Sequence, residues 1–145
     1  MPIGEYSSDF STLLQESIPN RFMNLTPNQF EDFILTLFKD MGYTSQLTSR
    51  SNDYGGDVLA ENETDKIIIQ VKRYHPNNTV GVQDINQVIG AKQYYNADKA
   101  IIVTTSNFSR NGVKLADQTD VELWDWDKLD QKIREQYLDG KTVYD

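Results

Sequence analysis

The feature that most constrains the fold is a pair of apolar runs, residues 66–73 and 100–105, separated by a helical pattern. The run at 100–105 is continuously apolar, which is typical of a strand buried on both faces of a parallel sheet. Helical spacing recurs between the two runs, at Val82, Ile85, Val88, Ile89 and Tyr95. Parallel strands need such a crossover connection, so the pattern predicts a strand–helix–strand unit and an α/β fold.

A core helix is predicted from residue 26 to residue 41. Thr26 is a suitable N-cap, Pro27 occupies the first helical position, Gln29 completes a capping box, and Gly42 ends the helix. One apolar stripe follows the helical period, at Phe30, Phe33, Ile34, Leu37, Phe38 and Met41. We expect this stripe to be buried, with Glu31 at its edge.

The remaining patterns complete one domain at 26–145, preceded by a helical leader at 1–25. The other predicted elements are strands at 43–48, 57–61 and 121–124 and helices at 110–118 and 126–138. Residues 62–65 are turn-like and make a hairpin of the strands that they join. The predicted order from residue 26 is α-β-β-β-α-β-α-β-α, a central mixed sheet flanked by helices.

Composition restricts the chemistry. The chain of 145 residues has no cysteine, so a metal would need oxygen ligands or the single histidine, which points to a hard cation. No apolar segment is long enough to cross a membrane, and we expect a cytoplasmic protein. The net charge of -8 argues against a polyanionic partner, but residues 50–114 carry eight basic and seven acidic side chains and are nearly neutral.

Strand geometry brings three polar residues together. Side chains alternate along a strand, so Gln70 and Lys72 point to the same face. If 62–65 is the hairpin loop, Glu61 pairs with Lys66, and counting back places Asp57 directly opposite Gln70. Cβ atoms of opposed residues lie about 4.5–5.5 Å apart, close enough for both side chains to hold one cation.

Oxygen atoms at this position suit Mg²⁺. The Asp57 carboxylate, the Gln70 amide oxygen and the backbone carbonyl of Val71 are ligands of the kind that this ion prefers. Lys72, beside them, would orient or deprotonate an attacking water and stabilise charge on a pentacovalent phosphate. The pattern predicts metal-assisted hydrolysis of a phosphodiester.

Asp57, a hairpin and then Gln70-Val71-Lys72 resemble the D…(E/D/Q)-x-K signature of PD-(D/E)XK nucleases, in its Gln form and closest to the Mrr-like restriction endonucleases. The likeness covers roughly residues 26–130, and its other parts are Gln29-Phe30-Glu31, Gly42-Tyr43, Asp53-Tyr54-Gly55-Gly56, Arg73-Tyr74 and residues 101–106. One departure is the pair of glycines directly before Asp57, where the family more often has an apolar residue.

The resemblance implies a restriction-endonuclease-like core and a Mg²⁺-dependent DNA endonuclease, with Mn²⁺ able to substitute. It makes Asp57, Gln70 and Lys72 catalytic, and Glu31 the helix acid that completes the metal site. Gln87, in the following predicted helix, matches the family less clearly and would contact nucleic acid. Double-stranded DNA is the expected substrate, and specificity would come from a homodimer, a partner subunit or the structure of the DNA, since a chain of this size offers little surface for base readout.

Structural interpretations stand beside these functional ones. Lys72 could be a surface lysine on an edge strand, Gln70 a buried amide satisfied by backbone groups, and Glu31 an exposed acid in a first helical turn. We expect His75 to be a solvated or locally bonded loop residue, and Trp124 and Trp126 to pack in the core. Several polar residues flank the predicted site and could contact phosphates, namely Arg50, Arg73, Asn78 and Lys92.

Two other functions stay open. A nuclease-fold protein that binds nucleic acid or a protein without cutting is compatible with the acidic charge and with glutamine in the motif. A nuclease acting on RNA is the other, because a fold alone does not fix a substrate.

Overall fold

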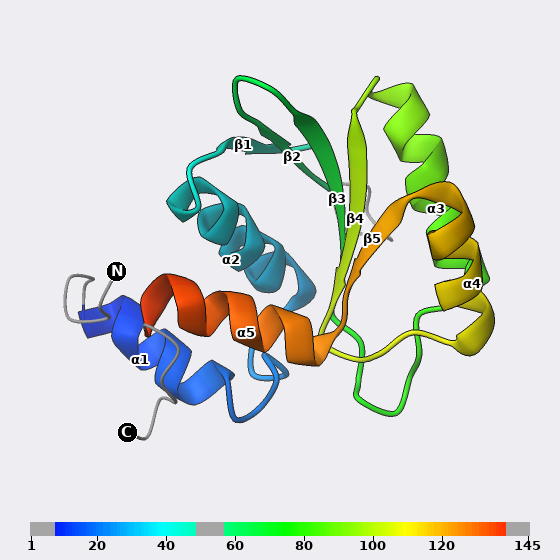
Figure 1. Ribbon diagram of the computed structural model, residues 1–145. Helices are drawn as coiled ribbons and strands as arrows, with labels where there is room; N and C mark the ends of the chain where they lie inside the picture. Colours follow the sequence, from blue (N-terminus) through cyan, green and yellow to red (C-terminus); the bar gives the residue numbers. More distant parts are fainter. Residues whose placement is uncertain (1–7, 49–56, 139–145) are drawn as a thin grey trace.

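The computed structural model describes residues 8–48 and 57–138, which form a sheet covered by helices on both faces (Figure 1). The helices are α1 (Ser8–Ser17), α2 (Pro27–Asp40), α3 (Val82–Tyr94), α4 (Arg110–Thr119) and α5 (Trp126–Tyr137). The strands are β1 (Thr44–Leu47), β2 (Asp57–Glu61), β3 (Lys66–Lys72), β4 (Lys99–Thr104) and β5 (Val121–Trp124). None of the helices in these ranges is long and apolar enough to cross a membrane.

The sheet has the order β1-β2-β3-β4-β5 and is mixed. Strands β1, β2 and β3 pair antiparallel, whereas β3, β4 and β5 pair parallel. The two crossover helices, α3 and α4, cover one face, and α1, α2 and α5 lie on the other (Figure 1). The strand–helix–strand unit and the α/β fold with a mixed sheet are therefore confirmed, and β3 is the central strand.

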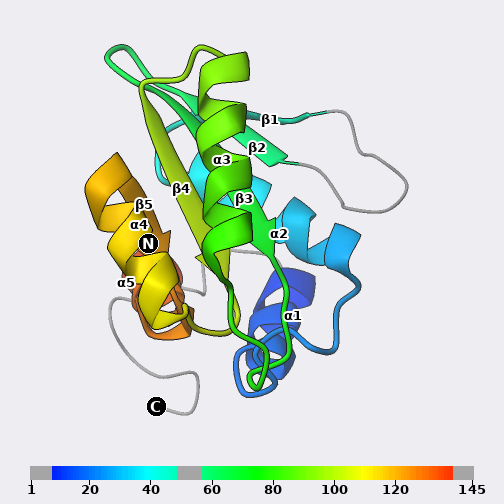
Figure 2. The same ribbon diagram turned by 90° about the vertical axis from the view of Figure 1, so that its right-hand side faces the viewer.

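The core forms on both faces of β3. Ile67, Ile69 and Val71 pack into the cluster beneath α1, α2 and α5, whereas Ile68 packs into the cluster beneath α3 and α4. Figure 2 shows α3 lying along this second face, over β3 and β4. Burial on both faces explains why this strand is apolar at successive positions instead of alternating.

The predicted start and stop of α2 are confirmed. The Thr26 hydroxyl accepts the Gln29 amide at 3.1 Å, and the Gln29 side chain accepts the Thr26 amide at 2.9 Å. Gly42 follows the C-cap with a φ of 106°, a left-handed conformation that glycine adopts without steric cost. These contacts fix the first turn of α2, directly before Glu31.

The segment before residue 26 contains α1, so the leader is helical where it is described. Leu14, Ile18 and Phe22 are buried in the same cluster as α2 and α5. The Phe22 ring lies 4.8 Å from that of Phe33, centroid to centroid. Residues 8–25 thus contribute to the core of the domain that we placed at 26–145, and the boundary at residue 26 stays a prediction.

Candidate active site at the end of the central strand

Asp57 and Gln70 lie directly opposite each other in the β2–β3 hairpin, as the loop count predicted. The loop is closed by Asn62, whose side-chain oxygen accepts the amides of Thr64 and Asp65 at 3.0 and 2.7 Å. At the other end, the Thr48 hydroxyl accepts the Asp57 amide at 2.9 Å. The loop sets the register, and Thr48 holds the backbone where β2 begins.

Lys72 is the last residue of β3 and projects toward α3. Its side chain is 13% exposed, and the strand has a hydrogen-bonded neighbour on each side. The interpretation of Lys72 as a snorkelling lysine on an edge strand is therefore wrong. Asp57, Gln70 and Lys72 lie on the face that also carries Leu59 and Ile68, so the predicted shared face is confirmed.

The side-chain oxygen of Gln70 is buried and has no hydrogen-bond partner among the described residues. A buried amide satisfied by backbone groups is thus not what the structure contains. An unsatisfied buried acceptor costs about 1–3 kcal/mol, and such atoms usually have an unseen partner such as water or an ion. The position suits a cation, because the Asp57 carboxylate comes from the directly opposed residue.

Glu31 is 3% exposed, so the interpretation as an exposed helix acid is wrong. Although α2 covers the opposite face of the sheet, the charge of Glu31 acts on Asp57. Burial raises the pKa of Asp57 above its usual 3.8, the ammonium of Lys72 opposes that rise, and the Glu31 carboxylate adds to it. Two acids and one lysine therefore share a poorly solvated region where β2 begins and β3 ends.

The sequence analysis missed Asp84, in the first turn of α3. Its Oδ1 lies 3.5 Å from the Lys72 ammonium and accepts the Tyr74 hydroxyl at 3.2 Å. Its Oδ2 accepts the backbone amide of Gly81 at 3.1 Å. Burial, and then the charge and hydrogen bond of Asp84, raise the pKa of Tyr74 above its usual 10.0, so the phenol stays a donor. The one sequence signal for Asp84 was its position three residues after Gly81, a spacing that suits the start of a helix.

The backbone after Lys72 is fixed by β4. The strand ends at Lys72, one residue earlier than predicted, because the Tyr74 amide turns back to the Lys72 carbonyl at 3.1 Å. The Thr104 hydroxyl donates to the same carbonyl at 2.8 Å, and the Thr105 hydroxyl donates to the Tyr74 carbonyl at 2.7 Å. Both threonines are fully buried, so the exit of the chain from β3 is rigidly defined.

The predicted donors contain few carboxylates. Within residues 8–48 and 57–138, no group of three or more His, Cys, Asp or Glu side chains is arranged to hold a metal ion. The predicted ligand set relies on two acids, Asp57 and Glu31, together with the Gln70 amide oxygen and the Val71 carbonyl.

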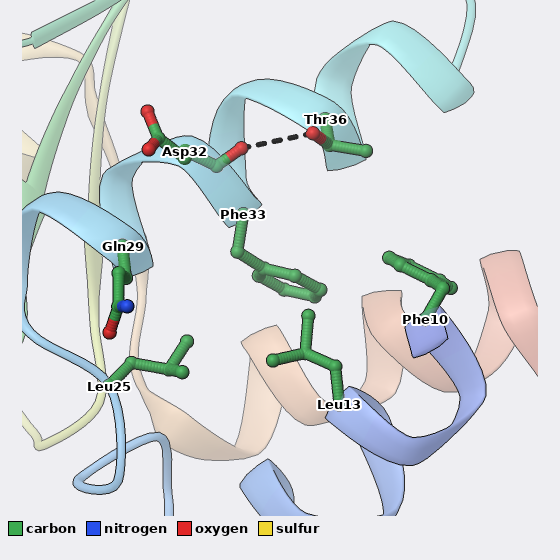
Figure 3. A pocket seen from close by; sticks show the side chains of 7 residues that line it. All are labelled: Phe10, Leu13, Leu25, Gln29, Asp32, Phe33 and Thr36. Carbon is green, nitrogen blue, oxygen red and sulfur yellow. Dashed lines mark hydrogen bonds between the residues drawn. The ribbon is translucent and has the colours of Figure 1, made fainter. Parts of the chain in front are cut away.

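An apolar pocket of about 300 Å³ lies between α1 and α2, away from this chemistry. Figure 3 shows the residues that line it, Phe10, Leu13, Leu25, Gln29, Asp32, Phe33 and Thr36. None of them is a predicted site residue. The candidate active site is therefore the polar cluster at the end of β3.

Comparison of the sequence with known families gives one match. The family Mrr_cat, described as restriction endonuclease, matches residues 22–133, most of the chain. The chain belongs to this family. The resemblance inferred from Asp57, Gln70 and Lys72 is thus confirmed. No curated protein is significantly similar to this Mrr_cat chain in sequence.

Solved structures share the fold of this Mrr_cat domain. The DNA modification-dependent restriction endonuclease AspBHI matches with a TM-score of 0.65 and 21% identity, over 93% of this chain and 38% of AspBHI. The MspJI restriction endonuclease, solved in complex with a 27-mer oligonucleotide, matches with a TM-score of 0.59 and 19% identity, over 96% of this chain and 35% of MspJI. The chain thus spans well under half the length of these two proteins.

The residues expected to contact nucleic acid are Arg73, Gln87 and Arg50, and the structure describes the first two of them. Arg73 points to the α2 side, where its Nη1 lies 3.3 Å from the Met23 sulfur and its Nε is buried without a partner among described residues. Gln87 is exposed on α3, one turn after Asp84. Arg50 lies outside the described residues, as does the segment 53–56 that precedes Asp57.

His75 and the tryptophans follow the structural interpretation. His75 is exposed, and its Nδ1 accepts the Asn77 amide at 3.2 Å. Trp124 is buried in the core, where its ring lies 5.3 Å from Phe38, and Trp126 packs against the same cluster.

Proposed function

We propose that the chain is a Mg²⁺-dependent DNA endonuclease that hydrolyses phosphodiester bonds of double-stranded DNA at the cluster of Asp57, Gln70 and Lys72. The observation that carries the proposal is the buried oxygen of Gln70, which has no hydrogen-bond partner among the described residues and comes from the residue directly opposite Asp57, two residues before Lys72. The Mrr_cat family supports the reaction class. AspBHI is a DNA modification-dependent restriction endonuclease, and MspJI was solved with a bound oligonucleotide, which supports DNA as the polymer.

The donor chemistry fits a hard cation. Asp57 and Gln70 would hold it, with the Val71 carbonyl and Glu31 as further oxygen ligands. When bound, Mg²⁺ polarises the phosphate and lowers the pKa of a coordinated water. Mn²⁺ takes the same oxygen ligands, so we expect it to substitute. The raised pKa of Asp57 is consistent with a carboxylate whose natural counter-charge is a cation.

The side chains of the protein then do the remaining work. The Lys72 ammonium would donate a hydrogen bond to the attacking water and so orient it, and would place its charge beside the phosphate as negative charge develops, while the proton of the water would pass to solvent. The Arg73 guanidinium lies on the α2 side against Met23, so it would contact a phosphate on that side of the site with the N–H donors that this contact leaves over. The buried Thr104 and Thr105 hydroxyls donate to the Lys72 and Tyr74 carbonyls, so they fix the backbone on either side of Arg73.

Cleavage assays test the proposal. Wild type, Lys72→Met and Lys99→Met are incubated with supercoiled DNA, methylated and unmethylated, and with RNA, in Mg²⁺, Mn²⁺ or EDTA. Lys99 is a matched control, since it lies on the adjacent strand and pairs with Asp65 instead of the site. We expect nicking of DNA only with metal, at least 100-fold slower in Lys72→Met and unchanged in Lys99→Met.

Three results would contradict it. Metal-independent cutting would remove the proposed cofactor. Cutting of RNA alone would make the protein a ribonuclease. No cutting of any substrate, with calorimetry that detects no Mg²⁺ binding, would favour the nuclease-fold protein that binds without cleaving.

A further inference from the structure

We propose that Asp84 is a positioning residue, which holds the Lys72 ammonium in place for hydrolysis. It thereby raises the rate of cleavage, while its negative charge weakens the binding of DNA. The inference rests on the proposed function and adds to it a residue outside the D…QxK motif. It is carried by the contacts of a single carboxylate, which joins the end of β3, the segment that follows it and the first turn of α3.

The Asp84 carboxylate is itself fixed from two directions. Oδ2 accepts the Gly81 amide, so the side chain is tied to the start of its own helix. Oδ1 accepts the hydroxyl of Tyr74, whose ring packs against the cluster beneath α3 and α4. A carboxylate with two such donors has little rotational freedom left, so it is a rigid reference point for a third group.

The third group is Lys72. A lysine side chain loses rotamer entropy when it is fixed, and that loss slows a reaction if it occurs in the transition state. Here the Lys72 ammonium already lies 3.5 Å from Asp84 Oδ1, with both side chains mostly buried, at 13% and 17% exposure. The ammonium has three donors, so those not directed at Asp84 remain for water or phosphate.

Helix capping alone does not require this contact. In α4 the Ser109 hydroxyl accepts the amide of Gly112, and in α5 the Asp125 carboxylate accepts the amide of Lys128. Within the described residues, neither cap forms an ion pair with a predicted catalytic group, whereas the carboxylate at the start of α3 does. A simple cap would also be served by an uncharged acceptor, which makes the negative charge of Asp84 the informative feature.

That charge has two opposite effects. It lies beside the proposed binding site of a polyanion, so it repels the DNA backbone and weakens binding. It also holds Lys72, so it raises the rate of the chemical step. Loss of a purely structural residue would not lower the cleavage rate while leaving DNA binding unchanged or stronger. Separate measurement of binding and of rate therefore distinguishes the two roles.

The test compares Asp84→Asn with Asp125→Asn. Asparagine keeps an oxygen that can accept the Gly81 amide, so the cap survives while the charge is lost. Asp125→Asn removes a charge from the N-cap of α5, where the carboxylate also accepts a backbone amide but forms no contact with Lys72 in the described part of the chain. Tyr74→Phe removes the hydroxyl and keeps the ring. Binding of a fluorescein-labelled duplex is measured by anisotropy without metal, and cleavage by single-turnover rates with Mg²⁺.

We expect the cleavage rate of Asp84→Asn to fall at least 10-fold, with Kd for the duplex unchanged or lower and a melting temperature close to that of Asp125→Asn. Tyr74→Phe should show a smaller fall in rate, and Asp125→Asn none. A wild-type rate in Asp84→Asn would overturn the inference and leave the nuclease proposal intact. So would a rate loss that follows a loss of melting temperature. If wild type itself does not cleave, the proposed function fails first, and the catalytic role of Asp84 with it.

Discussion

Replacement of Gln70 by methionine should make the metal-free protein more stable. The Gln70 oxygen is buried and accepts no hydrogen bond within residues 8–48 and 57–138, and such an acceptor costs about 1–3 kcal/mol. Methionine has a similar length, packs in irregular apolar spaces and brings no strong acceptor. In EDTA we therefore expect the free energy of unfolding to rise by about 1–3 kcal/mol, or about 2–4 °C in melting temperature for each kcal/mol.

Addition of Mg²⁺ should make wild type more stable to unfolding than Gln70→Met. A ligand that binds only the folded state at 100 times its Kd adds about 2.7 kcal/mol. Wild type should gain this stabilisation, whereas Gln70→Met should gain little, because it lacks the side-chain oxygen that would bind the cation. Urea unfolding followed by circular dichroism, in EDTA and in Mg²⁺, measures all four free energies.

Gln46→Met is the control for this experiment. Gln46 is an exposed residue of β1, so its replacement should change stability by less than about 0.5 kcal/mol in either buffer. The reasoning is refuted if Gln70→Met is less stable than wild type in EDTA, or if both proteins gain equally from Mg²⁺. Either result would mean that the Gln70 oxygen is satisfied in solution by something other than a cation.

Two further predictions concern charge. Because the folded-state pKa of Asp57 is raised by burial, its ionisation destabilises the metal-free protein: stability is fully present below the usual 3.8 and is lost as pH rises through the raised value. Asp57→Asn should remove this loss, so its stability relative to wild type should grow with rising pH across that window, and a constant difference in urea titrations at several pH values would contradict the prediction. Arg73→Gln should weaken DNA binding and lower the slope of log Kd against log salt by about 1, since one phosphate contact is lost; an unchanged slope would place Arg73 outside the interface.

The geometry of Asp57 and Gln70 could be predicted from the sequence because a hairpin is a local structure. A short loop fixes which residues pair, and the period of two then fixes which side chains share a face. Counting from Asn62–Asp65 was enough to set Asp57 opposite Gln70. The start of α2 was equally local, since Thr26 and Gln29 bond to each other.

The environment of Glu31 and the role of Asp84 could not be predicted in this way. A helical period places Glu31 at the edge of an apolar stripe, but its near-complete burial depends on how α2 packs against the sheet. Asp84 reaches Lys72 only because the segment after β3 sets the rotation of α3 over that strand. The phase of a helix relative to a strand is a tertiary property, and no spacing along the chain encodes it.

The unfavourable features of the molecule gather at the end of β3. Of the three buried side-chain atoms without a hydrogen-bond partner in the described ranges, two belong to Gln70 and Arg73, and the carboxylate with the raised pKa is Asp57. The same strand carries Ile68 and Ile69, both fully buried, and burial of each contributes about 1.5–3 kcal/mol. The central strand can thus hold unsatisfied polar groups at its end because its middle is fully buried on both faces. Polar groups left without partners beside such a well-buried strand indicate a missing ligand, which is why the metal-dependent change of stability at Gln70 is a direct test of the site.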